Sequence, residues 1–256
     1  MKHSIIAAAL LLSPSVAFAQ ETPATQPADS AAPADAAAPA DTAPAQSAGE
    51  MTQDQIAAYN QAVADFTAGQ GLQQAGDNAG ALAKYQAALP AIRTAVQVKP
   101  ADMNNVNFLA STLYVAAAAQ GALGNFDAII PLYEEAAPLY RQVTAANPAD
   151  AQTRNILAGM LVQLGNAKLT KQDKAGAAPY YSEAKTLAQK SVTENAADKI
   201  SANILLSAMI GQSQTSEDPT VRQAAVDLGK KMIANGTIDQ VNKPSIDIMT
   251  GGASAS

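Results

Sequence analysis

Cysteine and tryptophan are absent from this chain of 256 residues, and histidine occurs once, at His3. Without cysteine the protein has neither disulfide bonds nor a thiolate nucleophile. His3 lies in a leader that we expect to be removed, so the rest of the chain offers no histidine general base and no Cys or His zinc site. We therefore expect a protein that is not an enzyme and that holds no metal or cofactor.

The leader has the features of a secretory signal peptide. Lys2 supplies a basic start, an apolar run follows over residues 5–12, and Ala17 and Ala19 provide a small-x-small cleavage pattern. The run is too short to span a bilayer as a permanent helix. We predict a signal peptide over residues 1–19, cleavage after Ala19 and a bacterial, periplasmic location. No later stretch is long and apolar enough for a transmembrane anchor.

Residues 20–50 consist almost wholly of Ala, Pro, Asp, Thr, Gln and Ser. Such a composition buries too little apolar surface to offset the entropy of ordering, and repeated proline favours an extended chain. We predict a disordered Ala/Pro-rich linker.

The charge of the exported chain argues against nucleic acid as a partner. Loss of Lys2 leaves 15 of the 16 basic side chains against 22 acidic ones, a net charge of −7. Phosphate binding requires a basic face, and the basic residues here are scattered.

The sequence repeats with a period of 48 residues between positions 51 and 236. Three sets of residues show the period: Tyr85, Tyr133 and Tyr181; Ala88, Ala136 and Ala184; and Asp102, Asp150 and Asp198. Apolar residues within each unit recur at helical spacing, and the aspartates stand where a first helix should begin. A fixed period of this size indicates a stacked repeat array. We predict three full units and a weaker fourth, each made of two helices.

The turn between the two helices carries a recognisable pattern. The second unit has Gly124, Asn125, Phe126, Asp127, Tyr133 and Ala136, and the first has Gly76, Asp77, Asn78, Ala81, Tyr85 and Ala88. These residues resemble the tetratricopeptide repeat family, which implies an all-α, right-handed solenoid of antiparallel helix hairpins over residues 51–236. The third unit keeps Gly165, Ala177, Tyr181 and Ala184 but has Gln172 and Asp173 in place of the turn glycine pattern.

The repeat is longer than that of the family, whose unit has about 34 residues. The spacings between corresponding residues of this repeat and of the family's repeat divide the extra residues evenly between the two helices of each unit. We therefore predict helices about two turns longer than usual.

In this family the first helices line the concave face, so the resemblance implies that ligands bind there. One column of residues is Asn107, Asn155 and Asn203, headed by Tyr59; a second is Phe66, Tyr114, Val162 and Ile210; Ser111, Gly159 and Ser207 lie between them, and Asn166 also faces the groove. A primary amide both donates and accepts, so the asparagines can hold the main chain of a peptide. We predict an exported scaffold that binds a protein or peptide segment, in cell-envelope assembly.

Alternatives stay open. The asparagines could bond adjacent first helices to each other, with Phe66 and Tyr114 in the core. The apolar column could instead bind a small apolar ligand, which would make the protein a periplasmic carrier. The tail, residues 237–256, could cap the array or lie in the groove.

Overall fold

The computed structural model of the protein describes residues 49–251, and the structural statements that follow refer to these residues. The predicted signal peptide (1–19) and residues 20–48 of the predicted linker lie outside the described residues. The end of the tail, residues 252–256, lies outside them too.

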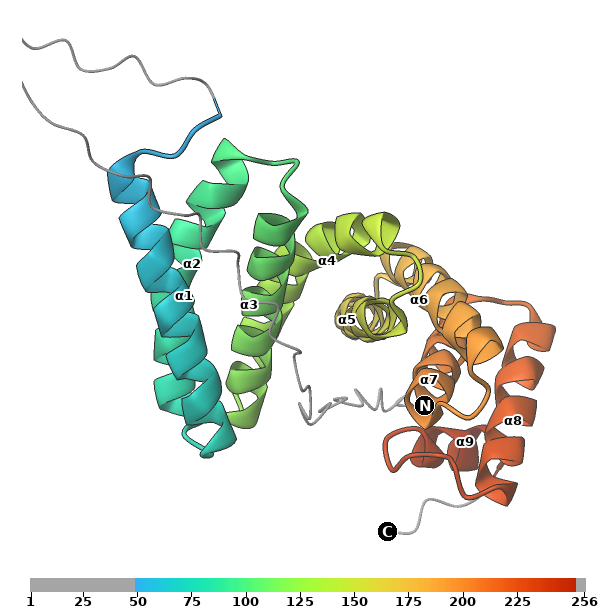
Figure 1. The fold of residues 1–256 in the computed structure, drawn as a ribbon. Helices are drawn as coiled ribbons and strands as arrows, with labels where there is room; N and C mark the ends of the chain where they lie inside the picture. Colours follow the sequence, from blue (N-terminus) through green and yellow to red (C-terminus); the bar gives the residue numbers. More distant parts are fainter. Residues whose placement is uncertain (1–48, 252–256) are drawn as a thin grey trace, which may run out of the picture.

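The described chain forms helices and no strands. The helices are α1 (Gln53–Gln74), α2 (Asn78–Val98), α3 (Met103–Ala122), α4 (Ile129–Ala146), α5 (Ala151–Thr170), α6 (Lys174–Glu194), α7 (Lys199–Thr215), α8 (Pro219–Ala234) and α9 (Lys243–Met249), with a 3-10 turn η1 (Phe126–Ala128) before α4. Each helix contacts the next along the chain (Figure 1). The predicted fold class is confirmed: an all-α array of the hairpins α1/α2, α3/α4, α5/α6 and α7/α8. None of these helices is both long enough and apolar enough to cross a membrane.

Aspartate side chains begin most of the helices. Asp102, Asp150 and Asp198, at the predicted starts of the first helices, each accept a hydrogen bond from a backbone N–H in the first turn of α3, α5 and α7. The same cap occurs at the starts of α2, α6 and α8, with Asp77, Asp173 and Asp218. Each cap satisfies a donor that the helix leaves unpaired, which typically stabilises by about 1 kcal/mol.

The turn inside each of the first three hairpins contains a left-handed residue. Gly76 and Gly124 provide it in the first two hairpins, with φ of 84° and 78°. Gln172 adopts a φ of 60° in the third hairpin. A residue with a Cβ is strained there by about 1–2 kcal/mol, so the packing of the two helices imposes the turn even where the glycine is lost.

The extra residues of the repeat belong to the helices and not to the connections between them. Those of the first three hairpins contain 18 to 22 residues and are joined by short connections. The prediction of lengthened helices is therefore confirmed.

Tyrosine rings packed on glycines join the helices of the array. Tyr181 on α6 is fully buried, and a Cβ added to Gly165 of α5 would lie 2.8 Å from its ring. A Cβ added to Gly211 of α7 would lie 2.1 Å from the same ring. Tyr85 packs on Gly69 in the same way, with a corresponding distance of 2.6 Å. Glycine is therefore required for α5 and α7 to enclose the ring of Tyr181.

The second hairpin lacks these glycines. Ala117 stands where Gly69 and Gly165 stand in the neighbouring units. Its tyrosine, Tyr133, is only partly buried and stacks on Tyr114, with ring centroids 6.5 Å apart and an angle of 17° between the rings. In this hairpin the ring of Tyr133 therefore stacks on a tyrosine of α3 and has no glycine of α3 to pack on.

Two ion pairs link the second helices of neighbouring hairpins. Arg93 on α2 donates to Glu135 on α4 at 2.7 and 2.9 Å, and Arg141 on α4 donates to Glu183 on α6 at 2.7 and 2.8 Å. All four side chains are 35–41% exposed, so water screens each pair and limits its contribution to about 1 kcal/mol. The pairs repeat every 48 residues and hold neighbouring hairpins in the same register.

The C-terminal segment covers the last hairpin. Ile246 on α9 is fully buried in an apolar cluster with Leu206, Ile210, Ala225 and Met232. It reaches this position because Gly229 on α8 has no side chain; a Cβ there would lie 2.5 Å from Ile246. The segment after α8 thus covers a face that a further repeat would otherwise cover.

We expect Gly165→Ala to lower the free energy of unfolding by about 1–3 kcal/mol, because the new methyl group would overlap the buried ring of Tyr181. The control is Gly71→Ala in α1, where an added Cβ meets nothing within 4 Å. It should raise stability by about 0.5–1 kcal/mol through helix propensity. Urea unfolding followed by circular dichroism measures both; equal effects would contradict the packing of the ring on glycine.

Candidate interaction surface

The side chains predicted to line the concave face all lie on first helices of the hairpins. They are Tyr59 and Phe66 on α1, Asn107 and Tyr114 on α3, Asn155, Val162 and Asn166 on α5, and Asn203 and Ile210 on α7. Asn107 is the one among them that is exposed. The others are buried or partly buried, so the structure does not present them as one open column.

The apolar column belongs to the hydrophobic core. Phe66 packs edge-on against Phe108 of α3, with ring centroids 5.1 Å apart. Tyr114 and Val162 are 5% and 2% exposed, and Ile210 belongs to the cluster beneath α9. Protein atoms cover these side chains where the carrier hypothesis would place a ligand.

Hydrogen bonds join neighbouring first helices at two places. Tyr59 on α1 donates its hydroxyl to Asn105 on α3 at 2.9 Å, and Asn155 on α5 donates its amide to Ser201 on α7 at 2.8 Å. The partners are 46 residues apart in both pairs. Asn155 therefore makes the contact between adjacent helices that the sequence left open as an alternative. Asn166 is used within its own hairpin, where it accepts from the hydroxyl of Tyr181 at 2.6 Å.

Asn203 holds the segment that follows α8. Its amide nitrogen donates to the carbonyl of Thr237 at 2.9 Å, and its amide oxygen accepts from the backbone N–H of Asp239 at 2.9 Å. Asn242 adds a second contact, accepting from the hydroxyl of Ser207 at 2.8 Å and donating to the carbonyl of Asn203 at 3.1 Å. One amide on a first helix thus clamps the main chain of a non-helical segment.

The side chain of Asn107 has no hydrogen-bond partner within residues 49–251. The residue 46 positions further along is Thr153, and its hydroxyl donates to Asp150 at the start of its own helix, at 2.6 Å. The row of contacts between first helices is therefore interrupted between the second and third hairpins.

Unpaired polar atoms gather at the same junction. Among the described residues, the buried side-chain atoms without a partner are the hydroxyls of Tyr140 and Thr144 on α4 and the amide nitrogen of Gln163 on α5. The equivalent positions in the immediately neighbouring units hold apolar residues or glycine: Ile92 and Ala188, Val96 and Val192, and Val115 and Gly211. A buried polar group left unpaired costs about 1–3 kcal/mol. Packing of the hairpins alone does not account for these three polar residues.

The hydroxyl of Tyr140 is a proton donor at neutral pH. Burial raises the pKa of Tyr140, the nearby Ser111 opposes this rise, and Tyr114, Tyr133 and Asp150 add to it. Ser111 lies near enough to affect the pKa of Tyr140 but not in hydrogen-bond geometry. The unpaired donor therefore lies beside Ser111, one turn of α3 away from Asn107.

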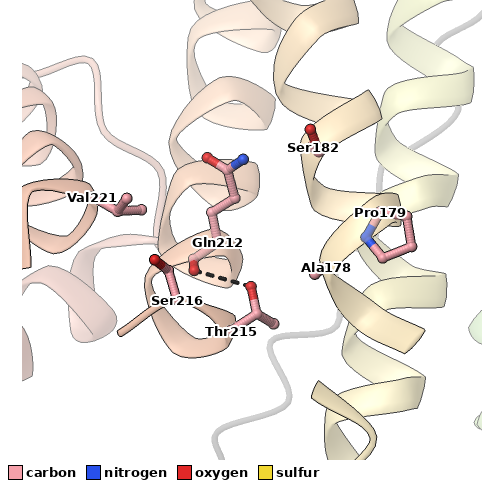
Figure 2. Close-up of a pocket in the computed structure, with 7 residues that line it drawn as sticks. All are labelled: Ala178, Pro179, Ser182, Gln212, Thr215, Ser216 and Val221. Carbon is pink, nitrogen blue, oxygen red and sulfur yellow. Dashed lines mark hydrogen bonds between the residues drawn. The ribbon is translucent and has the colours of Figure 1, made fainter. Parts of the chain in front are cut away.

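A separate hollow of about 400 Å³ lies between α6, α7 and the start of α8. Figure 2 shows its lining: Ala178, Pro179, Ser182, Gln212, Thr215, Ser216 and Val221. The hydroxyl of Thr215 donates to the main-chain oxygen of Gln212 at 3.0 Å. The lining contains no charged side chain and none of the residues predicted for the groove.

The described residues contain no group of three or more His, Cys, Asp or Glu side chains that could hold a metal ion. No family model matches the sequence, and no curated protein is significantly similar to it. The structure establishes a helical repeat array, and the finer resemblance to tetratricopeptide repeats rests on the residues of the repeats themselves.

The network around Asp198 predicts a pH dependence. Burial disfavours the charged carboxylate, but hydrogen bonds from Ser201, from the backbone N–H groups of Ile200 and Ser201, and from Asn155 outweigh it and lower the pKa of Asp198. A lowered native pKa stabilises the fold above the unfolded value of about 3.9. The contribution is lost as the pH falls through the native value.

Asp198→Asn keeps a good helix cap but removes the titrating group. We expect the variant to be less stable than the wild type at pH 7 and to lose less stability on acidification below about pH 5. Urea midpoints measured across this range check the prediction; parallel curves for the two proteins would contradict it.

Proposed function

We propose that the protein is a non-enzymatic, exported scaffold that binds a segment of another protein along the first helices of its hairpins, in assemblies of the bacterial cell envelope. The observation that carries this proposal is the pair of hydrogen bonds in which Asn203 donates to the carbonyl of Thr237 and accepts from the backbone N–H of Asp239. This contact uses main-chain groups, which every polypeptide offers. Asn107 presents the same amide, exposed and without a partner in the described residues, on α3.

Composition and architecture support binding over catalysis. Residues 20–256 contain neither histidine nor cysteine, the side chains most used as general bases and strong nucleophiles. Stacked hairpins present similar surfaces at regular intervals, which suits an extended partner. The acidic balance of the exported chain favours a protein partner over nucleic acid.

Asn107→Ala should weaken capture of a partner by about tenfold or more, because two main-chain hydrogen bonds are lost. The measurement is a pull-down from envelope extract of the producing cells, with residues 20–256 immobilised. The control is Gln142→Ala, which removes an exposed amide from α4, the second helix of the same hairpin. Circular dichroism confirms that both variants fold. Equal capture by the wild type and Asn107→Ala would contradict binding through the first helices.

Export has its own test. N-terminal sequencing of the protein recovered by osmotic shock should give Gln20 as the first residue, because signal peptidase cleaves after small residues. Ala19→Leu should leave the leader attached. Recovery of an uncleaved wild-type protein from the cytoplasmic fraction would exclude the periplasmic location.

A further inference from the structure

The junction between the second and third hairpins is the place where the row of contacts between first helices is open. Tyr59 bonds to Asn105 at the first junction, and Asn155 bonds to Ser201 at the third. Beyond the last hairpin, Asn203 bonds to the C-terminal segment. Asn107 alone in this row has no partner within the described residues.

A buried polar atom that has no partner among the described residues lies at the same junction. The hydroxyl of Tyr140 is unpaired although the residue is only 1% exposed, and it lies beside Ser111. Asn107 and Ser111 are four residues apart on α3 and therefore lie on the same side of the helix. An exposed amide and an unsatisfied hydroxyl donor are thus adjacent.

The last hairpin shows what kind of chain segment binds to a pair of side chains like Asn107 and Ser111. Asn203 and Ser207 occupy on α7 the positions that Asn107 and Ser111 occupy on α3. They hold the segment Thr237–Asn242, whose main chain pairs with Asn203 and whose Asn242 side chain accepts from the hydroxyl of Ser207.

The shape of that segment depends on its own aspartate. The carboxylate of Asp239 accepts from the backbone N–H of Asn242 at 2.7 Å, which closes a turn. The turn brings the carboxamide of Asn242 to Ser207 while the backbone N–H of Asp239 stays on Asn203. The recognised element is therefore an Asp-x-x-Asn turn preceded by a free carbonyl two residues earlier.

We propose that Asn107 and Ser111 form a recognition site for an Asp-x-x-Asn turn in a non-helical segment of a partner protein. Asn107 pairs with the carbonyl two residues before the aspartate and with the N–H of the aspartate. The carboxamide oxygen of the partner's asparagine accepts from the hydroxyl of Ser111, as Asn242 accepts from Ser207 at the last hairpin. This inference rests on the proposed function and adds the chemistry of the segment that is bound.

The test uses a peptide with the sequence of residues 236–243, Gly-Thr-Ile-Asp-Gln-Val-Asn-Lys. It is titrated into isotope-labelled protein comprising residues 20–256, and binding is followed by nuclear magnetic resonance. We expect saturable shifts at the side-chain amide of Asn107 and around Ser111, with a Kd of about 1 mM or tighter. Asn107→Ala should abolish these shifts, whereas Gln142→Ala should leave them unchanged.

Two further changes separate recognition from a structural effect. A peptide N-methylated at its aspartate lacks only the N–H donor and should not bind. Ser111→Ala removes the hydroxyl that donates to the peptide's asparagine, so it should weaken binding of the peptide by about fivefold.

Absence of saturable shifts would overturn the proposal. Shifts confined to Asn203 and Ser207 would overturn it too, because the peptide would then have displaced the chain's own segment. If the peptide does not bind but capture from extract still depends on Asn107, the scaffold function stands and the proposed recognition of an Asp-x-x-Asn turn is wrong. If neither depends on Asn107, both proposals fail.

Discussion

The packing of a tyrosine ring directly on a glycine of a neighbouring helix is the contact on which the array depends. Tyr181 lies between Gly165 and Gly211, so one ring joins α5, α6 and α7. Because the core is otherwise rich in alanine, each helix buries little apolar surface of its own, and stability has to come from close approach repeated along the array. The glycines permit this approach.

The second hairpin departs from this rule, and the departure accounts for the properties of its surface. Ala117 replaces the glycine beneath Tyr133, and Gln163 stands where Gly211 stands in the next unit. Tyr133 turns to stack on Tyr114, and the polar atoms of Tyr140, Thr144 and Gln163 are buried without partners. The side chain of Asn107 is left exposed at the same junction. The absence of the ring-on-glycine contact and the presence of unpaired polar groups therefore coincide at one place in the array.

The polar side chains of the first helices perform one kind of task with different partners. Asn155 bonds to the next helix, whereas Asn203 bonds to the main chain of the segment that covers the end of the array. A primary amide accepts either partner because it carries both donors and an acceptor. The scaffold function that we propose applies the same chemistry to a segment from another protein.

The sequence by itself determined the starts of the first helices, the period and the lengthening of the helices, since aspartate caps and apolar spacing act over a few residues. It also contains a further sign of the array: Arg93 and Arg141, like Glu135 and Glu183, are 48 residues apart, and their pairing links the second helices. Only the tertiary structure decided which predicted groove residues face solvent. Burial of Val162 or Ile210 depends on how closely neighbouring hairpins approach, and the partner of Asn203 lies in a tail outside the repeat period. Both depend on contacts between residues far apart in the chain, which a local pattern does not encode.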